Sequence, residues 1–207
     1  MKAEEQENSH NPAGHQARIP LFALQTWLFP HVPLQLQVFE RRYLDMVTEQ
    51  LKKDQGFGVV AIRQGAEVGP APQIFPLGVE VRVVDWSQRS NGVLSITVQG
   101  EHKFQVLRTE VRQSQLLLAD INYLPDEVAK PIGEHYVGLL NLLEQLKKHA
   151  AIKTMALPPV ADTAELGWQL AQVLPLEPVE KMALLALERP EERLDCLARK
   201  IGQLSAV

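Results

Sequence analysis

The hydrophobic pattern changes its period once along the chain, close to Pro125. Before this point, apolar and polar residues alternate, as in Leu34-Gln-Leu-Gln-Val38, which is typical of half-buried strands. After it, apolar residues recur every three or four positions, as in Ile132, Tyr136 and Leu139, which is typical of helices packed on a core. Strands followed by helices indicate an α+β protein with two subdomains.

The first part is predicted to hold short sequential strands joined by tight turns. Such strands pair antiparallel and form a closed or nearly closed barrel. One helix over 40–53 interrupts them, because Tyr43, Met46 and Val47 recur at helical spacing. Asn91-Gly92 has the left-handed preference of a hairpin turn. The predicted strands cover 19–24, 34–38, 57–62, 79–84, 94–98, 102–111 and 116–123.

The second part is predicted to be a helical bundle whose boundaries are marked by prolines and caps. Pro131 is placed to begin a helix that ends near Leu146, and Pro178 and Pro190 to begin two later ones. The run Asp162-Thr-Ala-Glu165 resembles a capping box, and residues 150–161 are predicted to be a linker. The predicted organisation is a disordered polar tail over 1–17, a barrel-like subdomain over 18–125 and a helical bundle over 126–207.

Charge and cysteine usage exclude several classes of protein. The formal net charge of −4 disfavours a dedicated nucleic-acid binder, which usually carries a basic excess. The single cysteine, Cys196, excludes an internal disulfide and fits a reducing compartment. No apolar run approaches the ~20 residues of a membrane span, and the N-terminus lacks the apolar core of a signal peptide. We therefore expect a cytoplasmic protein.

A search for catalytic patterns finds none of the strong ones. The sequence contains no P-loop, no His-Glu-x-x-His zinc motif and no Gly-x-Ser-x-Gly elbow. The histidines are scattered without helical pairing, and Cys196 has no visible activating base. The prediction is therefore that the chain has no catalytic residues, no metal and no cofactor.

An aromatic and proline-rich stretch stands out between positions 19 and 46. It concentrates aromatic area that can line a binding groove, since exposed apolar patches tend to mark interaction sites. The alternative is that the same residues belong to the core. Arg42 can also pair with Glu40 or Asp45, which would give it a structural role. The candidate protein- or peptide-binding residues are Phe22, Trp27, Phe29, Phe39 and Tyr43, with Arg41 and Arg42 at the rim.

The order and spacing of several fragments resemble a known family. They run from Ile19-Pro-Leu-Phe-Ala-Leu24 and Leu28-Phe-Pro30 through Val38-Phe-Glu-Arg-Arg-Tyr-Leu-Asp-Met46 to Leu77-Gly-Val79, Leu94-Ser-Ile-Thr-Val-Gln-Gly100 and Leu174-Pro-Leu176. Together they are similar to the N-terminal, substrate-binding domain of the ATP-dependent Lon protease, in its short stand-alone bacterial form. The resemblance covers about residues 18–204.

This resemblance implies a PUA-like β-barrel followed by a helical bundle. It implies a non-catalytic module that binds unfolded or protease-client proteins, without the ATPase and peptidase parts of Lon. Weak self-association is possible within this interpretation, and membrane binding is not expected.

Two other functions stay open at this point. The PUA-like fold suggests RNA binding, with a candidate basic patch of Arg82, Arg89, Lys103, Arg108 and Arg112, although the net charge makes nucleic acid an unfavoured partner. An enzyme with an unrecognised site would place it in a pocket between barrel and bundle, marked by titratable groups with perturbed pKa values.

Overall fold

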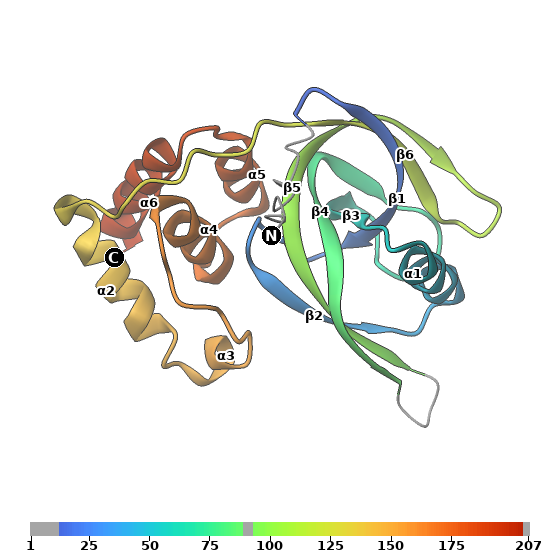
Figure 1. The fold of residues 1–207 in the computed structure, drawn as a ribbon, viewed down its shortest axis with the longest axis horizontal. Helices are drawn as coiled ribbons and strands as arrows, with labels where there is room; N and C mark the ends of the chain where they lie inside the picture. Colours follow the sequence, from blue (N-terminus) through green and yellow to red (C-terminus); the bar gives the residue numbers. More distant parts are fainter. Residues whose placement is uncertain (1–12, 89–92, 205–207) are drawn as a thin grey trace, which may run out of the picture.

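A computed structural model describes residues 13–88 and 93–204 of the chain. The strands are β1 (Gln16–Leu24), β2 (Pro33–Val38), β3 (Phe57–Gln64), β4 (Gln73–Gln88), β5 (Leu94–Val111) and β6 (Leu117–Tyr123). The helices are α1 (Arg41–Lys53), the 3-10 turn η1 (Glu134–Tyr136), α2 (Val137–Leu146), α3 (Ala150–Lys153), α4 (Thr163–Val173), α5 (Pro178–Ala186) and α6 (Pro190–Leu204). This arrangement confirms the α+β class, with the strands in one half of the molecule and all helices but α1 in the other (Figure 1).

The strands form a closed ring to which β2 is added. The pairing runs β5-β4-β3-β1-β6, and β6 returns to pair with β5. One edge of β5 is shared, because its first residues pair with β2 and its last residues pair with β6. Residues 94–99 of β5 pair with β4 on the opposite edge. Strand β2 therefore has a partner on one side only among the described residues.

Two features of the sheet differ from the sequence-based expectation. The pairing between β1 and β3 is parallel, which the rule of sequential antiparallel strands did not predict. In addition, β5 continues through Gly100 instead of ending there. A Cβ atom at Gly100 would lie 2.4 Å from the Phe29 carbonyl oxygen, so this glycine allows a close backbone approach within the strand.

The interior of the ring is built around Phe104 of β5. Its ring lies over Gly78 of β4 and Gly58 of β3, where a Cβ would come within 2.5 Å and 2.7 Å of the Phe104 Cζ atom. Leu21 and Ile121 from β1 and β6 complete this cluster and are fully buried. The two glycines thus supply the volume that the large aromatic side chain occupies.

The helix boundaries follow local chemistry in most places. The Asp162 carboxylate accepts hydrogen bonds from the backbone N–H groups of Ala164 (2.8 Å) and Glu165 (2.9 Å) at the start of α4, as the capping pattern predicted. Pro178 and Pro190 begin α5 and α6 as expected. Pro131 does not begin a helix, because the chain stays extended until the turn at Glu134.

Several predicted boundaries change or fall outside the described residues. Strand β1 begins at Gln16, inside the segment expected to be a tail, because it pairs with Asn122 of β6. The linker over 150–161 contains the short helix α3. The Asn91-Gly92 turn lies outside the described residues.

The helical part packs directly on the barrel, so one core spans both. Trp168 of α4 stacks on Phe29 with their ring centroids 5.5 Å apart, and Trp27 contacts Phe75 of β4 at 5.0 Å. Gln172 donates a hydrogen bond to the Trp27 carbonyl oxygen at 3.0 Å. Within the part of the chain that is described, no helix has the length and hydrophobicity that crossing a membrane requires.

Candidate functional site

The structure separates the predicted binding residues into buried and exposed ones. Phe22, Trp27, Phe29 and Tyr43 are buried in the core, which is the alternative that the sequence left open for the aromatic stretch. The physical reason is that α1 and the helical part cover them. Of the predicted aromatic side chains, Phe39 is exposed, at 60%.

The two predicted rim arginines also have different environments. The Arg41 side chain is 89% exposed and bonds Asp45 one helical turn away. The Arg42 side chain is only 4% exposed and pairs with Glu40, which is the structural role left open by the sequence. Of these two neighbouring arginines, Arg41 is therefore accessible to a partner, whereas Arg42 has a structural role.

Three of the predicted residues nevertheless line one groove, which we call the β2 slot. The slot has a volume of about 230 Å³ and lies between β2, the end of β1 and the start of α1. Consecutive β2 residues of both orientations line it, which places it at the edge of the strand and not over one face. Its lining residues are Phe22, Ala23, Leu24, Thr26, Leu34, Gln35, Leu36, Gln37, Val38, Phe39, Glu40, Tyr43, Glu67 and Val68.

Exposed apolar side chains stand at the mouth of the β2 slot. Phe39 is 60% exposed at the end of β2, and Val68 is 56% exposed on the loop between β3 and β4. Deeper in the slot, Phe22 contacts Tyr43 with ring centroids 4.0 Å apart, and burial raises the pKa of the Tyr43 hydroxyl. The slot therefore offers an apolar floor and an apolar rim to a segment that enters it.

Arg42 holds the wall of the β2 slot in place. Its guanidinium donates hydrogen bonds to the carbonyl oxygens of Glu67 (2.7 Å), Gly69 (2.9 Å) and Gln115 (2.9 Å). These contacts tie the β3–β4 loop and the β5–β6 turn to the first turn of α1. The wall is thus fixed before any ligand arrives, which lowers the entropy cost of binding.

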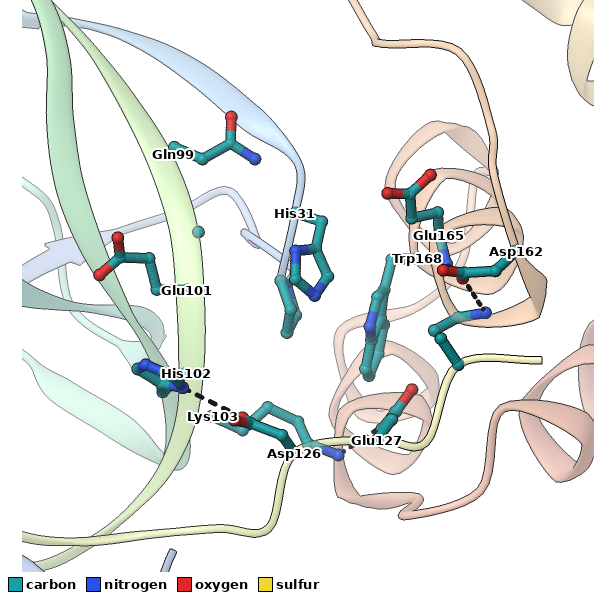
Figure 2. A pocket seen from close by; sticks show the side chains of 14 residues that line it. His31, Gln99, Glu101, His102, Lys103, Asp126, Glu127, Asp162, Glu165 and Trp168 are labelled. Atoms are coloured by element: carbon teal, nitrogen blue, oxygen red, sulfur yellow. Dashed lines mark hydrogen bonds and ion pairs between the residues drawn. The ribbon is translucent and has the colours of Figure 1, made fainter. Parts of the chain in front are cut away.

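A second cavity, the junction pocket, lies between barrel and helices. It has a volume of about 530 Å³ (Figure 2). Figure 2 shows it between β5, which carries Glu101 and Lys103, and α4, which carries Glu165 and Trp168. An enzyme site that no sequence motif marks, one of the alternatives left open by the sequence, was expected in such a pocket.

A buried ion cluster, Lys103–Glu127–Arg193, adjoins the junction pocket, which Lys103 and Glu127 line. Lys103 Nζ and Arg193 Nη1 donate to Glu127 Oε1 at 3.0 Å and 2.7 Å, and Lys103 also donates to the Leu187 carbonyl oxygen. The Arg193 guanidinium lies 3.1 Å from the centroid of the Trp168 ring. The cluster therefore joins β5, the connecting segment and α6.

Burial perturbs the pKa values of all three members of this cluster. It raises the pKa of the Glu127 carboxyl and lowers the pKa of the Lys103 ammonium. It also lowers the pKa of Arg193 to about 10, against the attraction of Glu127. Perturbed titratable groups often mark catalytic sites, but buried structural ion pairs produce the same shifts.

The geometry favours a structural role for the junction pocket. Each carboxylate that lines it is already hydrogen-bonded within the protein: Glu101 to Arg82, Asp126 to His102, Glu127 to Lys103, and Asp162 and Glu165 to backbone N–H groups. Among residues 13–88 and 93–204, no group of three His, Cys, Asp or Glu side chains could hold a metal ion. The pocket connects two halves of the fold through satisfied pairs.

Three residues of the predicted basic patch are paired with carboxylates, while a fourth, Arg108, is exposed on β5. Lys103 is buried in the ion cluster, Arg82 bonds Glu101, and Arg112 pairs with Glu110. Arg89 lies outside the described residues. The carboxylates beside Arg82, Lys103 and Arg112 reduce the positive charge that these side chains would contribute to a basic face.

A comparison with known protein families shows to which family the chain belongs. The family model for the substrate-binding domain of ATP-dependent protease La (Lon) matches residues 18–201. The chain belongs to the Lon substrate-binding domain family.

Solved structures and a curated sequence are similar to this Lon substrate-binding domain. A crystal structure of a Lon N-terminal domain protein from Xanthomonas campestris has 29% identity and a TM-score of 0.71, covering 88% of this chain and 98% of that one. The N-terminal domain of the Mycobacterium avium complex Lon protease has 16% identity and a TM-score of 0.55, covering 87% and 96%. A Lon protease from Amoebophilus asiaticus is 23% identical over 154 residues, which are 73% of this chain and 18% of that protein. The chain thus spans less than a fifth of the length of this curated relative.

The edge of β2 and the residue Val68 were not predicted from the sequence of this Lon substrate-binding domain. Alternation in β2 predicted a half-buried strand, but it carries no information on which edge is paired. Pro33 at the start of the strand is a signal that could have found it, because proline within sheets is confined to edges and strand starts. Val68 is an isolated apolar residue in a loop, and no sequence pattern marks it.

Proposed function

We propose that this chain is a non-catalytic module that binds unfolded segments of other proteins at the β2 slot. Membership of the Lon substrate-binding domain family supports a protein-binding role. The single observation that carries the site is the apolar groove whose mouth exposes Phe39 and Val68. Exposed apolar side chains around a preformed groove are typical of peptide-binding surfaces.

The remaining features of the proposal follow from the same interpretation. The proposed partners are unfolded or protease-client proteins. The proposal gives this chain neither the ATPase nor the peptidase activity of Lon. The single cysteine is compatible with a reducing compartment, so a cytoplasmic location is part of the proposal.

The experiment that tests the function is a binding titration with an unfolded protein. Fluorescein-labelled, reduced and alkylated lactalbumin is titrated with the purified chain, and fluorescence anisotropy measures the complex. We expect saturable binding that the double variant Phe39→Ala, Val68→Ala weakens about tenfold, since each truncation removes apolar contact area.

The matched control is Val128→Ala, which truncates an exposed valine in the segment that connects barrel and helices. This control should bind like the wild type. Equal binding by the double variant and the control would show that the β2 slot is not the binding site. Absence of any binding to the unfolded probe would contradict the proposed function itself.

A further inference from the structure

We propose that the β2 slot holds its peptide as an added β-strand, recognised through main-chain hydrogen bonds to Gln35 and Gln37. This inference rests on the proposed function and names its mode of recognition. The preferred occupant is an extended segment with apolar residues at alternating positions, no acidic residues, and a basic residue at one end.

Pairing with β5 fixes the direction of the β2 backbone groups. The Gly100 N–H donates to the Val32 carbonyl oxygen at 3.3 Å, and β2 and β5 pair in strict antiparallel register from Pro33↔Gln99 onward. Hydrogen-bonded and non-hydrogen-bonded pairs alternate along such a ladder. The N–H and C=O groups of Leu34, Leu36 and Val38 therefore point toward β5, as does the Val32 carbonyl.

The residues between them then point the other way. The N–H and C=O groups of Gln35 and Gln37 are directed to the outer edge of β2, where no strand of residues 13–88 and 93–204 pairs with them. Both side chains are exposed, so water reaches this edge. At every second residue this edge presents one backbone donor and one backbone acceptor without a strand partner. The backbone of another extended segment is complementary to this pattern.

The groove beside this edge has a shape that fits an extended segment. The slot runs along the whole of Leu34–Val38 and continues to the exposed Phe39 ring. Side chains of an added strand alternate in direction, so every second one would face the floor formed by Phe22 and Tyr43. The floor thus selects apolar residues at alternate positions without requiring a particular sequence.

The charge of the slot also bears on which segments it can bind. The ionisable carboxylates that line the slot are Glu40 and Glu67, and no lysine or arginine is among its lining residues. Glu40 is paired with Arg42, while Glu67 accepts one hydrogen bond from the Gln25 N–H at 2.6 Å through Oε1. Glu67 therefore keeps acceptor capacity at the loop side of the slot. This charge disfavours acidic segments and favours a lysine or arginine at the end beside Glu67.

The test uses a short synthetic peptide of alternating valine and threonine residues with lysine at both ends. A fluorescein label reports binding to the full chain by anisotropy. Two matched peptides carry N-methyl groups on alternate residues, one set on the odd and one on the even residues. N-methylation removes backbone donors while it leaves every side chain in place. We expect one of the two methylated peptides to bind about tenfold or more weakly than the parent, which corresponds to about 1.4 kcal/mol or more.

Variants of the protein give the reciprocal test. Gln37→Pro removes one of the two outward N–H groups of β2 and leaves the bonds to β5, since proline is tolerated where an edge N–H faces solvent. We expect about tenfold weaker peptide binding with a melting temperature within a few degrees of the wild type. Gln37→Ala keeps the N–H and should retain binding, which separates the backbone from the side chain.

Each outcome has a distinct meaning. If both methylated peptides and Gln37→Pro bind like their parents, strand addition is wrong, although unfolded lactalbumin can still bind and the proposed function then stands. If neither the parent peptide nor unfolded lactalbumin binds, the proposed function fails as well. If the chain is a dimer by light scattering that Gln37→Pro converts to monomer, and the peptide does not bind, a second copy occupies the edge and the proposal is overturned.

Discussion

Removal of the negative charge from the buried ion cluster should cost much of the stability of the fold. In Glu127→Gln the side chain keeps its size but loses its charge. The side chains of Lys103, Glu127 and Arg193 are 4%, 5% and 0% exposed, so the two cations would be left buried without a counter-ion. Breaking a buried ion pair in this way typically costs about 3–5 kcal/mol. For a chain of this size we expect a fall in melting temperature of roughly 10 °C.

The assay is urea unfolding followed by circular dichroism, with thermal unfolding as a second measurement. The matched control is Glu101→Gln, which breaks the pair between Glu101 and Arg82 on the barrel surface. Those side chains are 32% and 49% exposed, and such exposed pairs contribute only ~1 kcal/mol or less. Equal losses of unfolding free energy in the two variants would refute the reasoning.

A further variant separates the cost of leaving charges buried without a counter-ion from the cost of losing hydrogen bonds. Replacing the whole cluster by Lys103→Met, Glu127→Leu and Arg193→Met removes all three charges at similar volume. Apolar replacement of complete buried ion clusters is often neutral or stabilising. We therefore expect this triple variant to be more stable than Glu127→Gln, and a triple variant that is less stable would show that the hydrogen bonds and the Trp168 contact dominate.

Three other predictions follow from individual contacts. Arg42→Ala should lower the free energy of unfolding by about 2–4 kcal/mol, since it leaves three loop carbonyls without their donor. In the same urea titration, Arg41→Ala should change the free energy of unfolding by under about 0.5 kcal/mol, because the Arg41 side chain is exposed. Gly78→Ala should destabilise by about 1–3 kcal/mol or more, because its Cβ would lie 2.5 Å from the Phe104 ring; thermal unfolding measures this, and a neutral result would contradict the packing of the barrel interior. Burial raises the pKa of Glu80 above its ordinary value of 4.5, so just above pH 4.5 the folded state keeps a proton that the unfolded state has lost. Stability therefore falls as the pH rises through this interval, and Glu80→Gln should make the decline shallower in urea titrations across the acidic range.

The change of hydrophobic period predicted the order of strands and helices because it reports which residues face a core. Local signals were equally informative at α4, where Asp162 caps the helix, and at α5 and α6, where prolines begin them. Each of these features depends on residues within a few positions of one another. A short stretch of sequence is therefore enough to predict them.

Features that depend on distant residues could not be predicted in this way. The Trp27 backbone is bonded by Gln172, far along the chain, so the burial of the aromatic stretch is decided by helices that follow much later. The parallel pairing of β1 with β3 arises from the closure of the ring, which no local pattern records. Gly100 looked like a strand end, but it is there because the Phe29 carbonyl oxygen passes too close for a side chain.

The β2 slot and the ion cluster are built from different elements, and this separates their effects. The slot belongs to β1, β2, α1 and the β3–β4 loop, whereas the cluster belongs to β5, the connecting segment and α6. Effects at separate sites without shared partners are usually additive. Glu127→Gln should therefore lower stability and leave peptide affinity unchanged at temperatures where the variant is folded. Arg42→Ala should change both, because Arg42 bonds Glu40 and the Glu67 carbonyl, and both of these residues line the slot. Loss of peptide affinity in both variants would mean that the barrel and the helices determine the shape of the slot together.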